Sequence, residues 1–190
     1  MAIAGQIISN KVTGEKLTYL QTSDDTGGKF TQFRLWVSPK GNMPMRHIHP
    51  DLSETVEVIS GVFKVECDGQ IMYLKPGEKF TIDKGKPHQW WNESDSQEAQ
   101  VIFTIEPTGK FEVMQEQIFG ICNAKGKLSF LQIMVMAKEY DMIIAGPPLF
   151  IQRVMWAVLS PIGRLLGLKK YYPEYSLKSS VSTIVSDYVR

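Results

Sequence analysis

The sequence predicts a mainly β fold followed by a C-terminal α-helical extension. Up to about residue 106, short segments rich in β-branched and aromatic residues alternate with turn signals, a pattern typical of a sandwich or barrel of strands. Beyond Pro107, apolar residues recur at helical intervals instead. With 190 residues, the chain is long enough to bury a core and to carry an extension. We predict a β-barrel domain over residues 1–110, a helical extension over 111–176 and a tail over 177–190.

The expected strands follow one another closely along the β-barrel domain. They cover residues 6–9, 15–22, 30–38, 54–60, 62–67, 70–74, 79–82, 88–92 and 100–105. Turn signals such as Gly61, Asp68-Gly69 and Lys84-Gly85 separate most of them. Within residues 30–38, apolar side chains alternate with Gln32, Arg34 and Trp36, which is the period of a strand with two different faces.

Three helices are expected in the extension, over residues 111–119, 128–140 and 149–159. In the second, Leu128, Leu131, Met134 and Val135 would share one face. Proline cannot continue a helix, so the Pro147-Pro148 pair should separate the second helix from the third. A basic and apolar stretch that begins at Pro161 follows the third helix.

The three histidines of the chain, with one glutamate, form a candidate metal site. His47 and His49 are two residues apart, so on a strand both imidazoles project from the same face. Glu54 follows after a short polar stretch that can turn the chain back, and His88 follows a turn signal at Gly85. Neutral imidazoles and a carboxylate suit a divalent ion, and Fe, Mn, Ni, Zn and Cu are not distinguished by these ligands.

The period of a strand separates the ligand candidates from their neighbours. Counted from Glu54, Val56 and Val58 share its face, whereas Glu57 lies on the opposite face, so Glu54 and not Glu57 is the ligand candidate. Counted from His88, Trp90 and Asn92 lie on the metal side. The candidate pocket-lining residues are therefore Val56, Val58, Trp90 and Asn92.

Two segments of the chain, residues 41–61 and 77–92, resemble the signature motifs of the cupin superfamily. The first motif is usually written G-x5-H-x-H-x3,4-E-x6-G, and every specified position is filled, by Gly41, His47, His49, Glu54 and Gly61. The second is usually G-x5-P-x-G-x2-H-x3-N, and it is matched by Gly77, Gly85, His88 and Asn92. Asp83 stands where the family has proline, a residue that sets a turn and carries no ligand, so this departure concerns turn stiffness.

This resemblance implies a small single-domain bacterial cupin with a double-stranded β-helix, or jelly roll, over about residues 30–106. It implies one divalent metal ion bound at the mouth of the barrel by His47, His49, Glu54 and His88. Four protein ligands would leave one or two positions for water or substrate, which is the arrangement of a catalytic metal. The helical half resembles a C-terminal extension found on some bacterial cupins.

Two classes of function remain open. The first is a metal-dependent enzyme, such as an oxygenase or an isomerase, that acts on a small organic substrate. The second is a non-catalytic module that binds or senses a small molecule at the metal. The fold does not choose between them, and no catalytic residue beyond the ligands can be named. The candidate walls are apolar, so an apolar or aromatic substrate is expected rather than a sugar phosphate.

Composition excludes several other classes. A net charge of +1 gives no electrostatic basis for nucleic-acid binding. The two cysteines, Cys67 and Cys122, lie far apart and form no recognisable metal or disulfide motif, so a cytoplasmic location is expected. Residues 1–6 lack the start of a secretory signal.

The basic and apolar part of the extension allows two interpretations. Arg153, Arg164, Lys169 and Lys170 accompany apolar and aromatic residues, a composition compatible with a lipid surface. Arg153 and Arg164 bracket too short a segment to span a bilayer core of about 30 Å, so no transmembrane segment is expected. Helices of soluble proteins also bury apolar faces against neighbours, so we favour packing on the barrel or on a partner subunit, and a homodimer. The tail over 177–190 is compatible with a swapped strand or with disorder.

Overall fold

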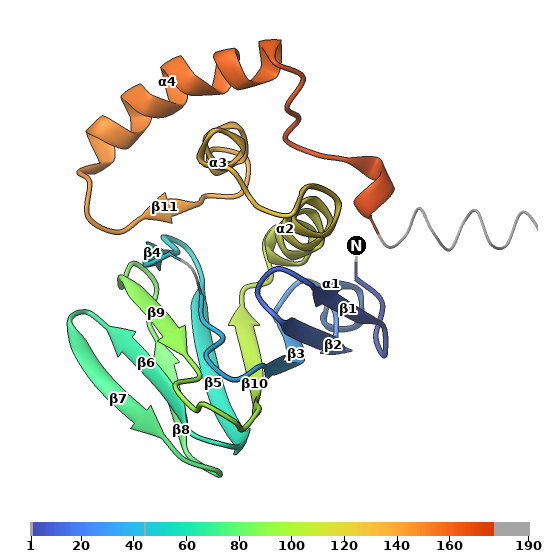
Figure 1. Cartoon of the computed structure of the whole chain (residues 1–190), viewed down its shortest axis with the longest axis vertical. Helices are drawn as coiled ribbons and strands as arrows, with labels where there is room; N and C mark the ends of the chain where they lie inside the picture. The colour runs from blue at the N-terminus through green and yellow to red at the C-terminus, as the bar shows by residue number, and fades with distance from the viewer. Residues whose placement is uncertain (1, 44, 177–190) are drawn as a thin grey trace, which may run out of the picture.

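Two antiparallel β-sheets face each other in the computed structural model of the chain, and a group of helices lies at one end of them (Figure 1). The structure describes residues 2–43 and 45–176; the tail predicted over residues 177–190 lies outside this part. The fold is mainly β, with a jelly roll followed by C-terminal helices, as the sequence predicts.

The first sheet has the strand order β1-β2-β3-β10-β5-β8. Its strands are β1 (Ile7–Asn10), β2 (Glu15–Gln21), β3 (Thr31–Val37), β10 (Ala99–Glu106), β5 (Ser53–Ser60) and β8 (Lys79–Ile82). Buried and more exposed residues alternate along β3, β5 and β10, because one face of the sheet covers the core.

The second sheet has the strand order β11-β4-β9-β6-β7. Its strands are β11 (Ile143–Ile144), β4 (His47–Ile48), β9 (His88–Trp91), β6 (Phe63–Cys67) and β7 (Gln70–Leu74). Asp68 and Gly69 both have positive φ, 53° and 84°, and join β6 to β7 as a two-residue hairpin turn. The sequence analysis did not predict β4 and β11, because two residues are too few to show a strand period.

Aromatic rings fill the space between the sheets. Phe33 stacks on Phe103 with ring centroids 5.5 Å apart, and Phe63 lies 5.3 Å from Trp90. All four are buried. Phe103 of the first sheet also lies 6.1 Å from Phe63 and 6.2 Å from Trp90 of the second, so the core is shared by both sheets.

Helices α2 (Phe111–Lys125), α3 (Phe130–Ala137) and α4 (Leu149–Leu165) form a layer that extends away from the sheets (Figure 1). The short helix α1 (Ser23–Thr26) lies instead beside the first sheet, and a 3-10 turn, η1 (Pro173–Tyr175), follows α4 in the chain. Phe111 at the start of α2 stacks on Phe33 at 5.7 Å, which places α2 over the first sheet. Among the described residues, none of the helices combines the length and the apolarity needed to cross a bilayer.

The helix ends differ from the predicted ones for local reasons. Helix α2 continues to Lys125, where Gly126, with φ 73°, ends it by a bond from its N–H to the carbonyl of Cys122. Helix α4 continues through Pro161 to Leu165, so the predicted end at residue 159 is wrong. Proline removes one backbone donor, but the bond from Leu166 N–H to Ile162 O shows that the next turn still forms.

Candidate metal centre

His47, His49, Glu54 and His88 come together at one end of the space between the sheets. One ligand atom from each lies within 4.8 Å of those from the other three. His47 of β4 is the direct cross-strand partner of His88 of β9, and Glu54 begins the inward face of β5 in the opposite sheet. His49 follows β4, where its carbonyl accepts a hydrogen bond from Gly85 N–H at 2.7 Å. Both sheets therefore contribute donors.

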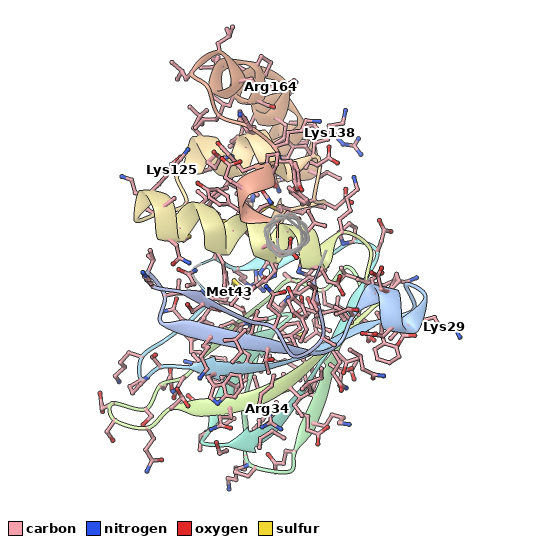
Figure 2. All side chains as sticks on the ribbon, turned by 90° about the vertical axis from the view of Figure 1, so that its right-hand side faces the viewer. Lys29, Arg34, Met43, Lys125, Lys138 and Arg164 are labelled. Atoms are coloured by element: carbon pink, nitrogen blue, oxygen red, sulfur yellow. The ribbon has the colours of Figure 1, made fainter. Side chains whose placement is uncertain are left out.

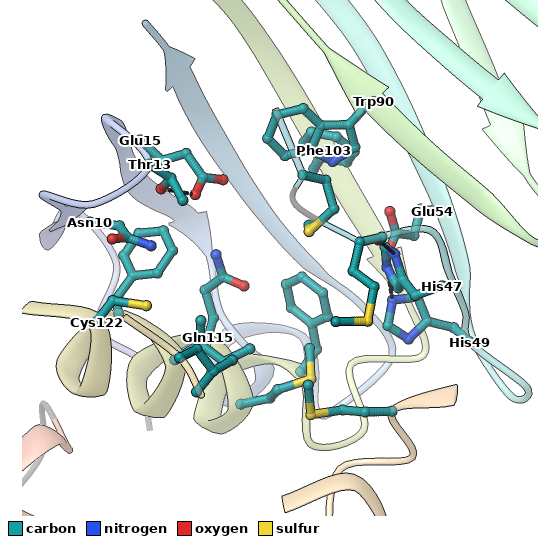
Figure 3. Close-up of a pocket in the computed structure, with 18 of the residues that line it drawn as sticks. Asn10, Thr13, Glu15, His47, His49, Glu54, Trp90, Phe103, Gln115 and Cys122 are labelled. Atoms are coloured by element: carbon teal, nitrogen blue, oxygen red, sulfur yellow. Dashed lines mark hydrogen bonds and ion pairs between the residues drawn. The ribbon is translucent and has the colours of Figure 1, made fainter. Parts of the chain in front are cut away.

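The ligand atoms of His47, His49 and Glu54 point toward one another (Figure 3), and that of His88 lies within 4.8 Å of them. The Nε2 atoms of His47 and His49 are 3.0 Å apart. His49 Nε2 lies 3.0 Å from Glu54 Oε1, and His88 Nε2 lies 3.6 Å from Glu54 Oε2. Imidazole nitrogens and a carboxylate converging in this way match the donors that a divalent transition metal accepts.

Backbone carbonyls orient two of the rings. Nδ1–H of His47 donates to Met45 O at 3.1 Å, and Nδ1–H of His88 donates to Lys86 O at 2.9 Å. A proton on Nδ1 leaves the Nε2 lone pair of each neutral ring free for a metal ion. His88 Nε2 is buried and has no hydrogen-bond partner among the described residues. A bound metal ion would accept the lone pair of this nitrogen. The residues present therefore fit a metal ion.

Burial and mutual interactions set the charges in the cluster. Burial, and then repulsion from His49 and His88, lowers the pKa of His47 to about 3, so this imidazole is neutral at pH 7. Burial alone would raise the pKa of Glu54, but the neighbouring His49 and His88 imidazoles hold it well below its usual value. A neutral imidazole beside an ionised carboxylate is the protonation state that binds a cation.

Residues 34–105 match the family model described as "Cupin domain". The chain carries a cupin domain. The two strands that bear Glu54 and His88 both lie within the matched residues. No curated protein matches the chain.

Several solved structures are similar to the cupin domain. An RmlC-like cupin from Shewanella frigidimarina is 21% identical, with a TM-score of 0.49, over 60% of this chain and 95% of the other. KdgF from Halomonas sp. is 15% identical, with a TM-score of 0.48, over 56% of this chain and 90% of the other. A predicted oxalate decarboxylase from Thermotoga maritima is 18% identical, with a TM-score of 0.48, over 55% of this chain and 93% of the other. At such identities the chemistry of the site has to be inferred from its own residues.

A cavity of about 210 Å³ extends from the metal ligands between the cupin domain and α2 (Figure 3). His47, His49 and Glu54 lie at one end of it. Aromatic and methionine side chains supply much of its wall, among them Phe33, Met43, Met45, Trp90, Phe103 and Phe111. No lysine or arginine lines it in the part of the chain that the structure describes.

The opposite end of the cavity is polar. Asn10, Thr13 and Glu15 lie there beside Cys122, and the amide of Gln115 lies between this end and the metal ligands (Figure 3). Glu15 is only 5% exposed, and burial raises its pKa to about 7. A hydrogen bond from Thr13 has the smaller, opposite effect of lowering this pKa. The sequence analysis missed Glu15. The available signal was a carboxylate on the same face of β2 as Leu17 and Tyr19.

The predicted pocket residues have different positions. Trp90 lines the cavity. Val56 and Val58 share the buried face of β5 with Glu54, as the strand period indicated, but they belong to the core and do not line this cavity. The Asn92 amide donates to the carbonyls of Val37, Ser38 and Gln97, so it fastens β9 to neighbouring loops instead of lining the cavity.

Proposed function

We propose that the chain is a metal-dependent cupin enzyme, with oxygenase or isomerase chemistry, that acts on a small apolar or aromatic substrate. One observation carries the proposal: four metal-type donors converge at the end of an apolar cavity. The metal is one divalent ion among Fe, Mn, Ni, Zn and Cu, held by His47, His49, Glu54 and His88. When bound, such an ion supplies a Lewis acid, and iron or copper also supplies redox chemistry.

The residues of the chain prepare the site before any ligand enters. Met45 O and Lys86 O hold the rings of His47 and His88, which reduces the rearrangement needed for metal binding. The Glu54 carboxylate, buried and ionised, supplies the negative charge. Trp90 and Phe103 wall the cavity near the ligands and exclude water from the space where a substrate would contact the site (Figure 3).

The cavity also indicates the shape of the substrate. Oxygen donors would face the metal ligands, an apolar or aromatic body would contact the walls, and a hydrogen-bonding group would reach Glu15 or Gln115 at the other end. Sugar phosphates fit poorly, because no cationic side chain among the described lining residues would pair with a phosphate.

A non-catalytic binding or sensing module is the alternative. The observation that favours it concerns acid–base groups. Among the described residues and apart from the metal ligands, the titratable side chains that line the cavity are Glu15 and Cys122, and both lie at the end remote from the metal ligands (Figure 3). An enzyme that moves protons near the metal would have to use a metal ligand or water.

Location and assembly belong to the same proposal. Cys67 and Cys122 are buried and unpaired, which supports a cytoplasmic location. Ile71 and Tyr73 are exposed on β7, the edge strand of the second sheet, and such an apolar edge supports a homodimer.

The test begins with protein purified without a metal-binding affinity tag. We expect close to one divalent ion per chain by elemental analysis. In thermal unfolding, naphthoate and decanoate should then stabilise the protein more than glucose 6-phosphate does. Stabilisation by the sugar phosphate alone would contradict the assigned substrate class. Oxygen uptake or chemical conversion of the bound probe supports the enzyme, whereas complete recovery of unchanged probe with every metal tested supports the binding module.

A further inference from the structure

The apolar face of α4 points away from the rest of the protein. Phe150 is 68% exposed, Val154 60% and Leu165 88%. Other large apolar residues of the same helix are also exposed, namely Leu149, Ile151, Val158 and Ile162. Met155, Trp156 and Leu159 are half-buried on the opposite side, so α4 is apolar on two sides and leaves the more exposed one uncovered, whereas helices of soluble domains normally bury such a face.

Specific contacts hold α4 in this orientation. The buried residues of the helix are Gln152, Ser160 and Gly163, and none of them is a large apolar residue. The Gln152 side chain accepts from Ile144 N–H at 3.0 Å and donates to Ile144 O at 2.9 Å, which fastens the helix to β11.

Close packing on α3 adds a second constraint. A Cβ atom at Gly163 would lie 2.5 Å from Val135 Cγ2, so only glycine permits this approach of α4 to α3. Rolling the helix to bury its apolar face would break the Gln152 bonds and move bulkier residues against α3. The outward face is therefore a feature of the packed structure.

The charges around this face have one sign. Between Asp141 and Glu174 the sequence contains four cationic residues and no acidic one. Arg153, Arg164 and Lys169 are exposed, and the spacing of about three turns between the two arginines places them on the same flank of α4. The exposed apolar stripe thus has a basic border.

A second copy of α4 is a poor partner for this surface. In an antiparallel helix pair the same flanks meet, so Arg153 and Arg164 would approach the arginines of the other copy without an acidic partner. A negatively charged lipid surface instead accepts both features, because the apolar side chains enter the interface and the arginines meet headgroups. We propose that the outward face of α4, bordered by Arg153 and Arg164, binds the surface of an anionic lipid bilayer.

The position of α4 in the molecule permits this contact. It lies at the outer end of the structure, where α3 and the edge strand β11 separate it from the other strands (Figures 1 and 2). A helix of 17 residues is about 25 Å long and would lie along the membrane without crossing it.

The experiment is flotation of the full-length protein with two vesicle types, phosphatidylcholine alone and phosphatidylcholine mixed with phosphatidylglycerol. We expect flotation with the mixed vesicles only, and weaker flotation at high salt because screening reduces the attraction. Charge reversal by Arg153→Glu with Arg164→Glu should lower the bound fraction at least about tenfold, since each cation contributes on the order of 1 kcal/mol. Phe150→Ser with Leu165→Ser should lower it as well. Both pairs change exposed residues, so the melting temperature should stay the same.

A matched control reverses two exposed cations elsewhere, Lys29→Glu and Lys84→Glu, with the same change in net charge. Lys29 lies beside α1, far from Arg164 (Figure 2). This control should float like the unchanged protein. Equal losses in the control and the arginine variant would overturn the proposal, and so would absence of flotation with anionic vesicles. A Phe150→Ser, Leu165→Ser variant that loses a dimer in light scattering, without any lipid binding by the unchanged protein, would assign the face to a second copy.

Discussion

Glu54 and Glu57 lie on one strand but in different environments. Glu54 is buried and lies 3.0 Å from His49 Nε2, whereas Glu57 is on the outer face of β5 and pairs with Lys79 at 2.9 Å. The separation follows from the strand period, which sends residues an odd number of positions apart to opposite faces.

Replacing these glutamates should have opposite effects on metal content. Glu54→Ala removes the anionic donor, so metal content measured after dialysis should fall at least about tenfold, in the range seen when a metal site loses a supporting interaction. Glu57→Ala removes an exposed ion pair worth at most about 1 kcal/mol and should leave metal content unchanged. Loss of metal in Glu57→Ala alone would show that the donor assignment is wrong.

Glu15 is a buried carboxyl group with an unusual titration. Burial raises its pKa from 4.5 to about 7, so between these values the folded protein holds a proton that the unfolded chain releases. The contribution of Glu15 to the free energy of unfolding therefore decreases as pH rises through this window, by about 3 kcal/mol in total.

Glu15→Gln should remove this pH dependence, because the amide does not ionise and can still accept the hydrogen bond from Thr13. Urea unfolding at a series of pH values between about 5 and 8 provides the measurement. The variant should be more stable than the unchanged protein at the upper end of the range and similar to it at the lower end. Parallel stability curves for the two proteins would refute the role given to Glu15.

At the scale of elements, the contact between α3 and α4 depends on a residue without a side chain. Gly163 lets α4 approach Val135, and nothing larger fits without a shift of the helix. Ala157 is on the same helix but is exposed. The two positions therefore separate the effect of packing from that of helix propensity.

Gly163→Val should destabilise the protein by about 1–3 kcal/mol through overpacking, whereas Ala157→Val should cost less than about 1 kcal/mol. Hydrogen exchange of the α4 amides should become faster in the first variant only. Equal exchange in both variants would mean that α4 does not depend on this contact.

At the scale of the whole molecule, the donor cluster joins the two sheets. Glu54 belongs to the first sheet, and His47 and His88 belong to the second. A ligand bound only by the folded state stabilises it by mass action, so a metal held by both sheets should stabilise the protein as a unit.

Free metal at about one hundred times its dissociation constant should add about 2.7 kcal/mol to the free energy of unfolding. For a chain of this size, that corresponds to a rise of roughly 5–10 °C in melting temperature. The variant His47→Ala with His49→Ala should show no such rise, and a chelator should reverse it in the unchanged protein. An equal rise in the double variant would place the metal elsewhere.

Local patterns in the sequence determined most of the strands, the faces of β5 and β9, and the presence of helices after Pro107. These features follow from side-chain periods and turn residues, which act over a few positions: Glu54 and Val56 share a face wherever the strand lies, and Asp68-Gly69 favours a hairpin in any sheet. The match of the histidines to family motifs belongs to the same class of information.

Only the tertiary structure decided which distant residues share a space. Glu15 and Gln115 line one cavity because α2 packs beside the first sheet, and Asn92 turns to backbone carbonyls because loops surround it. The sequence also did not show that the apolar face of α4 points outward, because its amphipathic pattern favoured burial. Gln152 and Gly163 reverse that expectation by packing against β11 and α3. Such choices depend on contacts between segments far apart in the chain, which no local period encodes.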